Sequence, residues 1–500
     1  MFNGSETTAV CVILIIAVAI LAWGYNRAKS YGKLGILAWL QSVVLMIPWL
    51  LFFVLFAAGI YLNIVGIIFL LVASAGVYIY LGNRLRAAGQ DVMIQERAAQ
   101  RIKEEQELNS QEKRAENEGK ISADLLPIPE EDLKIIQGIF GIDTFFATET
   151  ISYQEGAIFK GNLRSDPEKA HERLSGKLKT ALGEKYRLFL VESPEEKPVV
   201  IVLPSSNDPE TTTLAQKNLA LVLFVATIAT SLEAVSLLQG FDLFNNLGRY
   251  KEAIPLSLGL WLILVAHEIG HGFLAQRYHI RLSVPFFLPT WQIGAFGAIT
   301  RFESLLPNRT ALFDIALAGP AVGGIVSLLM LIVGLILSHP GSTFQLPTGF
   351  FQGSILVGVF ARVILGEALQ QPIVDVNPLM IIGWLGLVIT ALNLLPAGQL
   401  DGGRVVQAIY GRKIAKRATI ATLVLLGIVI LINPANSIPL YWAILILFLQ
   451  RDLERPSLNE LTEVDDHRAA WGLLALFLML ITLIPFSSGL AGRIGIGVHY

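Results

Sequence analysis

Ten apolar runs, most of them long enough to cross a membrane, are spread along this chain of 500 residues. A bilayer offers no water to backbone N–H and C=O groups, so a chain crosses it only as helices of about 20 apolar residues or as a closed barrel. The runs lie at 9–25, 35–58, 61–82, 214–236, 255–276, 311–337, 378–397, 418–433, 438–450 and 470–490. They predict a polytopic α-helical membrane protein with about 9–10 spans, because 438–450 is short. The segment 353–368 is shorter than a span and carries Arg362 and Glu367, so we expect it at the membrane interface.

Composition and charge support this class. Hydrophobic residues make up 53% of the chain and charged residues 16%, and the net charge of −2 favours no nucleic-acid partner. The single cysteine, Cys11, excludes an intrachain disulfide and argues against a cysteine-ligated zinc site. If the N-terminus lies outside, most basic loop residues fall on the inner side, as the positive-inside rule requires. The first run has no basic region before it, so we expect no cleavable presequence.

The stretch between the third and fourth runs has a different character. Residues 91–118 are highly charged, with opposite charges three or four positions apart, which favours a solvated helix. A small soluble α+β domain is predicted after Pro127 and Pro129, inserted between the third and fourth spans. Its expected helices are Asp132–Phe140 and one that follows the capping-box spacing Ser165–Glu168 and ends near 182, and its expected strands are Ala157–Leu163, Tyr186–Glu192 and Val199–Leu203.

The run 255–276 contains His267-Glu268-x-x-His271. Residues four apart share one face of a helix, so both imidazoles can bind one metal ion, and Glu268 is then close enough to act on a metal-activated water. Ionisable side chains are costly in hydrocarbon and mark functional sites by default. The motif therefore predicts two ligands and a base of a zinc peptidase, and it lacks a third ligand.

A carboxylate far downstream can complete the site. The run 378–397 carries Asn393, is broken by Pro396 and Gly398, and leads to Asp401. Such a break is tolerated at membrane depth only where protein or trapped water satisfies the backbone. The topology brings Asp401 to the same inner half of the membrane as the two histidines. The sequence thus predicts a catalytic zinc site of two histidines and one carboxylate.

Other assignments fit parts of the same pattern. Asp401 could merely cap a short helix. Glu303 or Glu367 could be the third ligand of a different membrane zinc peptidase, although neither has the broken-helix setting. A secondary transporter also has broken helices and buried carboxylates but has no need of His-Glu-x-x-His. A catalytically silent scaffold is disfavoured because Glu268 is intact.

The two motifs together resemble the signature of the site-2 proteases, which are zinc metalloproteases that cleave membrane-embedded substrates. The second motif, N-x-x-P-x-x-x-x-D-G, is matched from Asn393 to Gly402. Residues 285–304, 314–320 and Gly161-Asn162-Leu163-Arg164 resemble the plant chloroplast and cyanobacterial branch of that family. The resemblance covers about 155–410. It implies Zn²⁺ as cofactor, with His267, His271 and Asp401 as ligands and Glu268 as the catalytic residue.

The expected reaction is hydrolysis of a peptide bond. Glu268 would take the proton of a zinc-activated water as the water attacks the carbonyl, and would return it to the leaving nitrogen. Asn393 could donate a hydrogen bond to the substrate carbonyl or oxyanion, and an interhelical hydrogen bond is an equally good role for it. Residues 284–300 look like a hairpin or strand that dips into the membrane, and its edge at Gly294 and Gly297 could pair with an unwound substrate by strand addition.

The resemblance also implies a setting. Expected partners are membrane-protein substrates, including membrane-anchored regulators, and the lipid bilayer. The expected location is a cyanobacterial plasma or thylakoid membrane, with the soluble domain and the active site toward the inner, cytoplasmic side. The predicted divisions are N-terminal spans 1–83, a charged helical linker 84–126, the soluble α+β domain 127–212, a zinc protease core 213–410 and C-terminal spans 411–500.

Overall fold

The computed structural model describes residues 128–497, with gaps at 154–155, 194, 291, 434–435 and 451, and scattered residues between 22 and 84. The chain divides into two compact units, Met1–Ile121 and Ser122–Tyr500, and the second unit contains both sequence motifs. The predicted spans 9–25, 35–58 and 61–82 and the charged linker 84–126 lie outside the described residues, apart from single positions.

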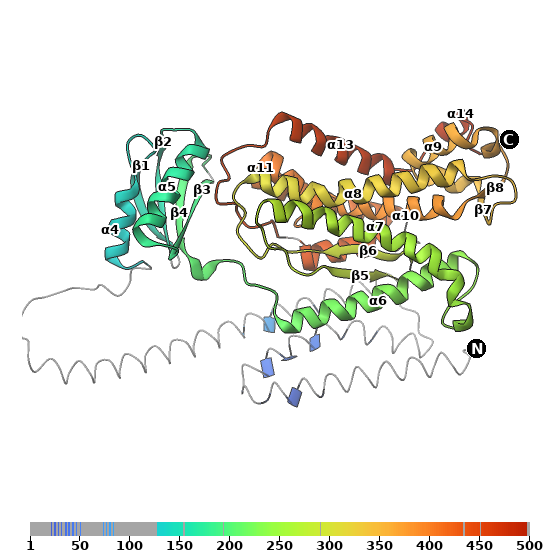
Figure 1. Ribbon diagram of the computed structural model, residues 1–500, viewed down its shortest axis with the longest axis horizontal. Coiled ribbons are helices and arrows are strands. Elements are labelled where there is room, and N and C mark those ends of the chain that lie inside the picture. Colours follow the sequence, from blue (N-terminus) through green and yellow to red (C-terminus); the bar gives the residue numbers. More distant parts are fainter. Residues whose placement is uncertain are drawn as a thin grey trace, which may run out of the picture. The chain divides into compact units, whose positions relative to one another are not determined.

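The N-terminal part of the second unit contains a small four-stranded sheet. Its strands are antiparallel in the order β1-β2-β4-β3, and two helices pack beside it (Figure 1). Phe145, Phe159, Leu174 and Leu190 fill the core between sheet and helices, each with no exposed side-chain surface. The elements are α4 (Glu130–Ile139), β1 (Phe145–Tyr153), β2 (Gly156–Leu163), α5 (Pro167–Leu182), β3 (Tyr186–Glu192) and β4 (Pro198–Pro204).

The predicted helices and strands of this domain are present, and two details differ. β1 was not predicted, because it is an edge strand whose sequence FFATETISY alternates only weakly. The cap of α5 is Asp166 rather than Ser165, since the Asp166 carboxylate accepts the backbone N–H groups of Glu168 and Lys169 at 3.1 and 3.4 Å. Gly161 pairs with Ala147 of β1 beside a shift in register, and a Cβ there would overlap the carbonyl group of Phe146.

Five helices in the described part of the chain are long and apolar enough to cross a membrane. They are α6 (Leu214–Leu238), α7 (Tyr250–Arg277), α8 (Arg309–Ile336), α11 (Asp401–Ile432) and α13 (Asp466–Leu483). Two further apolar helices are shorter, α10 (Pro378–Asn393) and α12 (Ile438–Leu445), and α12 runs on into a π-helical turn, Ile446–Gln450. These helices agree with the predicted apolar runs from 214 onward, although α11 begins well before its predicted run and bends at Gly411, where φ is +78°.

The core of the helical region is formed by α7, α8 and α10, which all pack against one another, and α8 makes the most extensive contacts of the three (Figure 1). The helices approach closely where one of them carries glycine. A Cβ at Gly383 of α10 would overlap the backbone of Leu331 in α8, so only glycine allows this spacing. α10 is buried along most of its length by this packing, which explains how a helix of 16 residues is held among longer ones.

The hairpin predicted to follow the His-Glu-x-x-His helix, α7, is present. β5 (Phe286–Thr290) and β6 (Gly294–Ile299) pair antiparallel and lie between α6 and α7 (Figure 1). The segment predicted at the interface forms α9 (Ile355–Leu365), whose 11 residues span about 16 Å, too short to cross. The remaining elements are β7 (Phe344–Pro347), β8 (Ile373–Val376) and α14 (Ser488–Arg493), together with short 3₁₀ turns.

Candidate active site

Helix α7 presents His267 and His271 on its buried face. The two side chains are one turn apart, and their Nε2 atoms lie 3.1 Å from each other. The Nδ1 of His271 donates a hydrogen bond to the carbonyl of Ile315 in α8 at 2.7 Å. This bond fixes the ring so that Nε2 points to His267, which is the arrangement expected of a metal-binding histidine.

Asp401 reaches the same point from the other motif. Helix α10 ends at Asn393, the chain turns through Leu394–Leu400, and α11 begins at Asp401. Gly402 and Gly403 lie directly under this turn, where Cβ atoms would overlap backbone carbonyls of the turn itself. The broken backbone is satisfied by protein groups, as predicted: Gly398 N–H donates to the Thr419 hydroxyl at 2.9 Å.

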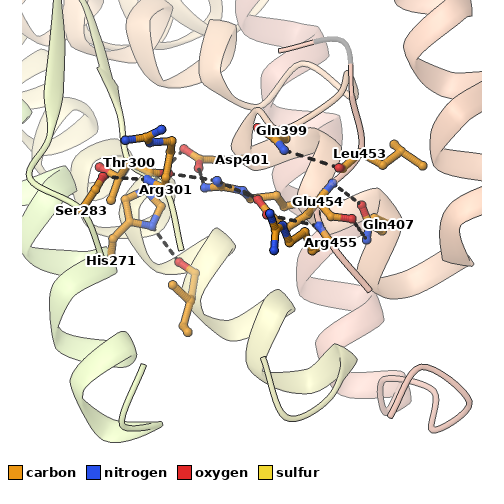
Figure 2. A network of polar contacts seen from close by, with 12 residues as sticks. His271, Ser283, Thr300, Arg301, Gln399, Asp401, Gln407, Leu453, Glu454 and Arg455 are labelled. Carbon is orange, nitrogen blue, oxygen red and sulfur yellow. Dashed lines mark hydrogen bonds and ion pairs between the residues drawn. The ribbon is translucent and has the colours of Figure 1, made fainter. Parts of the chain in front are cut away.

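The three side chains form a compact donor set. The Oδ2 of Asp401 lies 3.2 Å from His267 Nε2 and 3.5 Å from His271 Nε2, and all three side chains are buried. Figure 2 shows Asp401 beside His271. A tetrahedral zinc site with metal–ligand bonds of about 2.0–2.1 Å separates its donors by about 3.3 Å. The observed separations of 3.1 to 3.5 Å fit such a site, and the donor types fit zinc. In the described residues, no other group of three His, Cys, Asp or Glu side chains meets the spacing for a metal ion.

Glu268 lies beside this set and is half-buried. Its Oε2 accepts a hydrogen bond from the hydroxyl of Thr300, just after β6, at 2.8 Å. Glu268 and His267 line a small cavity together with Gly297 and Asn393. The sequence motif indicated Glu268, whereas nothing in the local sequence around Thr300 pointed to its contact with Glu268.

Asn393 and the two hairpin glycines take different places. The Asn393 amide donates to the carbonyl of Phe296 in β6 at 3.2 Å and to that of Ile389 in its own helix at 3.0 Å, so neither bond joins two helices. Gly297 has φ +102°, and a Cβ there would lie 2.6 Å from Asn393 Nδ2. Gly294 packs instead against α6, where Thr230 donates to its carbonyl at 2.6 Å. Gly297 therefore borders the cavity, and Gly294 does not.

A buried charge network behind Asp401 was not predicted. The guanidinium of Arg404 bonds to the Glu454 carboxylate, with Nε 3.0 Å from Oε2, and to the carbonyl of Thr300 at 2.9 Å (Figure 2). Its Nη1 lies 4.0 Å from Asp401 Oδ1. Arg404 follows the Asp-Gly-Gly of the second motif directly, and that position was the only signal in the sequence.

The alternative third ligands are held elsewhere. Glu303 accepts the backbone N–H of Thr212 at 2.8 Å, and Glu367 is exposed and lies 3.9 Å from Arg362. Neither belongs to the set formed by the histidines. The structure thus brings together Asp401 and the His-Glu-x-x-His motif.

Comparison with known proteins agrees with the geometry. Residues 255–433 match the family model described as peptidase family M50, and residues 134–210 match the one described as the EGY3 middle domain. Among similar proteins of Arabidopsis thaliana, one named probable zinc metalloprotease EGY2, chloroplastic, is 38% identical over 378 residues, covering 74% of this chain and 67% of the relative. Another, named probable zinc metalloprotease EGY1, chloroplastic, is 37% identical over 405 residues, covering 73% of each chain. No solved structure matches the chain significantly.

The family match and the donor set point to the same chemistry. The M50 region contains most of α7 and all of α8, α10 and α11, which together carry all three donors and Glu268. The sequence resemblance to the plant chloroplast branch is confirmed by these relatives. The chain therefore belongs to peptidase family M50, the site-2 protease family, and is a zinc metalloendopeptidase.

Proposed function

We propose that this protein is an intramembrane protease that hydrolyses peptide bonds within or near the transmembrane segments of membrane-protein substrates. The observation that carries the proposal is a buried His₂–Asp donor set on helices apolar enough to cross a membrane. A soluble peptidase has no need to place its metal ligands on such helices, because the burial of ionisable groups in hydrocarbon is costly.

His267, His271 and Asp401 would hold the zinc ion. Zinc bound there supplies Lewis acidity and lowers the pKa of water to about 7. Glu268 takes the proton of the attacking water and returns it to the leaving nitrogen.

The substrate must enter unwound, because the amides of a helix are sheltered by its own hydrogen bonds. Within the described residues β6 pairs with β5 alone, and Gly297 and Ala298 of β6 line the cavity beside Glu268. The carbonyl of Phe296 is turned to Asn393 rather than to β5. We therefore infer that an extended substrate segment pairs along β6 near Gly297, and that Asn393 keeps this strand in place.

The setting is also part of the proposal. We place about 9–10 spans in the membrane, with the divisions predicted above and with the soluble domain between the third and fourth spans. The distribution of basic residues favours an active site toward the inner, cytoplasmic side. A cyanobacterial plasma or thylakoid membrane remains the proposed location, and the similar proteins of Arabidopsis thaliana are named chloroplastic. Membrane-anchored regulators are the proposed substrates.

The test compares wild type with Glu268→Gln, Asp401→Ala and the control Glu303→Gln, purified in detergent. Bound zinc is measured by mass spectrometry, and cleavage is measured on labelled single-span peptides in liposomes. We expect Glu268→Gln to keep zinc and lose cleavage, and Asp401→Ala to lose zinc. Glu303→Gln should retain both properties, because Glu303 lies outside the donor set.

Three results would overturn the assignment. Normal cleavage by Glu268→Gln would remove its catalytic role. Zinc without cleavage in the wild type, across a panel of single-span peptides, would favour a silent scaffold. Cleavage of the same peptides only when they are free in solution would contradict the intramembrane site.

A further inference from the structure

Arg404 is a buried cation in an unfavourable place. It lies in the first turn of α11, where the helix dipole favours anions, and its side chain is 7% exposed. A buried arginine is tolerated only when its hydrogen bonds are made and its charge is balanced. Here the Glu454 carboxylate balances the charge, and the ring of Phe302 lies 4.7 Å from the guanidinium carbon. A position so costly for a cation suggests a role beyond packing.

Arg404 is linked to both carboxylates of the site, directly to Asp401 and through Thr300 to Glu268. Asp401 and Arg404 are three residues apart and share a helix face. Asp401 turns Oδ2 to the two histidines and Oδ1 to the guanidinium, 4.0 Å away. On its other side, Arg404 binds the Thr300 carbonyl, while the hydroxyl of the same threonine binds Glu268.

We propose that Arg404 and Thr300 are positioning residues for the zinc ligand Asp401 and for the base Glu268, with Glu454 as the counter-charge of Arg404. The inference rests on the proposed function of this site. The guanidinium restricts rotation of the Asp401 carboxylate, so that Oδ2 stays directed at the metal position. Thr300 holds Glu268 with its hydroxyl, and Arg404 holds Thr300 by its carbonyl.

Glu454 neutralises the charge of Arg404 beside the metal site. Unbalanced, the guanidinium would repel a divalent ion, and this repulsion is strong in a buried site. Gln407 fixes Glu454 through a reciprocal pair of hydrogen bonds to its backbone, at 3.0 and 3.2 Å. These bonds hold the segment around Glu454 against α11, next to Asp401 (Figure 2).

The first test separates the hydroxyl of Thr300 from its carbonyl. Thr300→Val removes the hydroxyl and keeps size and backbone, and Thr300→Ser restores the hydroxyl. We expect Thr300→Val to lower kcat about 10- to 100-fold with unchanged KM and zinc Kd, and Thr300→Ser to recover it. Thr482→Val is the matched control, because the hydroxyl of this buried threonine of α13 donates to the carbonyl of Leu478 in its own helix.

The second test measures metal binding without activity. Zinc Kd is determined by chelator competition, and the site is also loaded with Co²⁺ for its absorption spectrum. We expect Arg404→Gln and Glu454→Gln to weaken zinc about 10- to 100-fold and to alter the Co²⁺ spectrum. Arg309→Gln is the control, since Arg309 is buried but binds backbone carbonyls of α11, including that of Ala408 at 2.7 Å.

Loss of folding is controlled by the double variant Arg404→Gln/Glu454→Gln, which removes both charges and should recover stability without recovering zinc affinity. Wild-type kcat in Thr300→Val, or wild-type zinc Kd and Co²⁺ spectrum in Arg404→Gln, overturns the inference. If Glu268→Gln is inactive while these variants behave as wild type, only the positioning roles fail. If Glu268→Gln cleaves normally, the proposed function itself fails.

Discussion

Gly319 of α8 sits directly behind the His271 ring, and replacing it with alanine should disable the metal site. A Cβ at this position would lie 2.5 Å from Cδ2 and 2.6 Å from Cε1 of His271, and closer still to Nε2, the atom that faces His267 and Asp401. Since ordinary contact begins near 3.4 Å, the ring must retreat by about 1 Å. Metal–ligand distances tolerate only about ±0.2 Å.

The surroundings leave His271 no easy retreat. Its Nδ1 is tied to the Ile315 carbonyl at 2.7 Å. The helices cannot spread cheaply either, because Gly270 of α7 lies against the backbone of Ala318 in α8. We therefore expect Gly319→Ala to weaken zinc binding at least about 100-fold, which corresponds to about 2.7 kcal/mol. The overlap should also lower stability by about 1–3 kcal/mol, offset by up to about 1 kcal/mol because alanine favours a helix more than glycine does, so the loss of zinc is compared with the stability of the same variant.

The assay is zinc Kd by chelator competition in detergent, with thermal unfolding measured in parallel. A graded series on the same two helices provides the controls. At Gly323 a Cβ would lie 3.1 Å from His267 Cβ, and we expect a smaller loss. At Gly324 the nearest atom is Thr390 Cγ2 at 3.5 Å, and at Gly272 nothing lies within 4 Å, so these alanines should bind zinc normally. Equal zinc affinity in Gly319→Ala and Gly324→Ala would refute the reasoning.

Three further outcomes are expected. Gly297→Ala should raise KM and lower cleavage about tenfold or more without loss of zinc. A Cβ would lie 2.6 Å from Asn393 Nδ2, and a side chain at φ +102° strains the backbone by about 1–3 kcal/mol. An unchanged KM in steady-state kinetics would contradict this. Asp314→Asn should lower the free energy of unfolding by about 1 kcal/mol, because it weakens a partly exposed ion pair in which Arg468 donates to Asp314 at 2.7 and 3.0 Å. An unchanged thermal midpoint in detergent would count against this. Burial lowers the pKa of His171 in α5, so the folded chain binds this proton less tightly than the unfolded chain, and stability falls as pH drops below about 6.5. Hydrogen exchange in β3 and α5 should be faster at pH 5.5 than at 7.5 after correction for intrinsic rates, and His171→Gln should reduce the difference; equal pH sensitivity in both would show that another group is responsible.

Local rules made much of this protein predictable. Helical periodicity places His267 and His271 on one face wherever the helix lies, and the bilayer forces apolar runs into helices. Prolines and small residues marked the hairpin that forms β5 and β6. The edge strand β1 was not predicted, because its residues alternate only weakly between polar and apolar. Its pairing with β2 stabilises it instead.

The sequence by itself therefore determined the apolar helices from 214 onward, the hairpin, two candidate ligands on one helix face, the candidate base Glu268 and the candidate carboxylate at Asp401. Only the tertiary structure decided that this carboxylate meets the histidines, 3.2 and 3.5 Å away, and that Glu303 does not. It also revealed the contacts of Thr300, Arg404 and Glu454. Those residues are linked by hydrogen bonds between segments far apart in the chain, and no periodicity or spacing rule extends across such separations. Packing of α7, α8 and α10 sets these distances, because glycines at the helix contacts allow backbones to approach where any side chain would hold them apart.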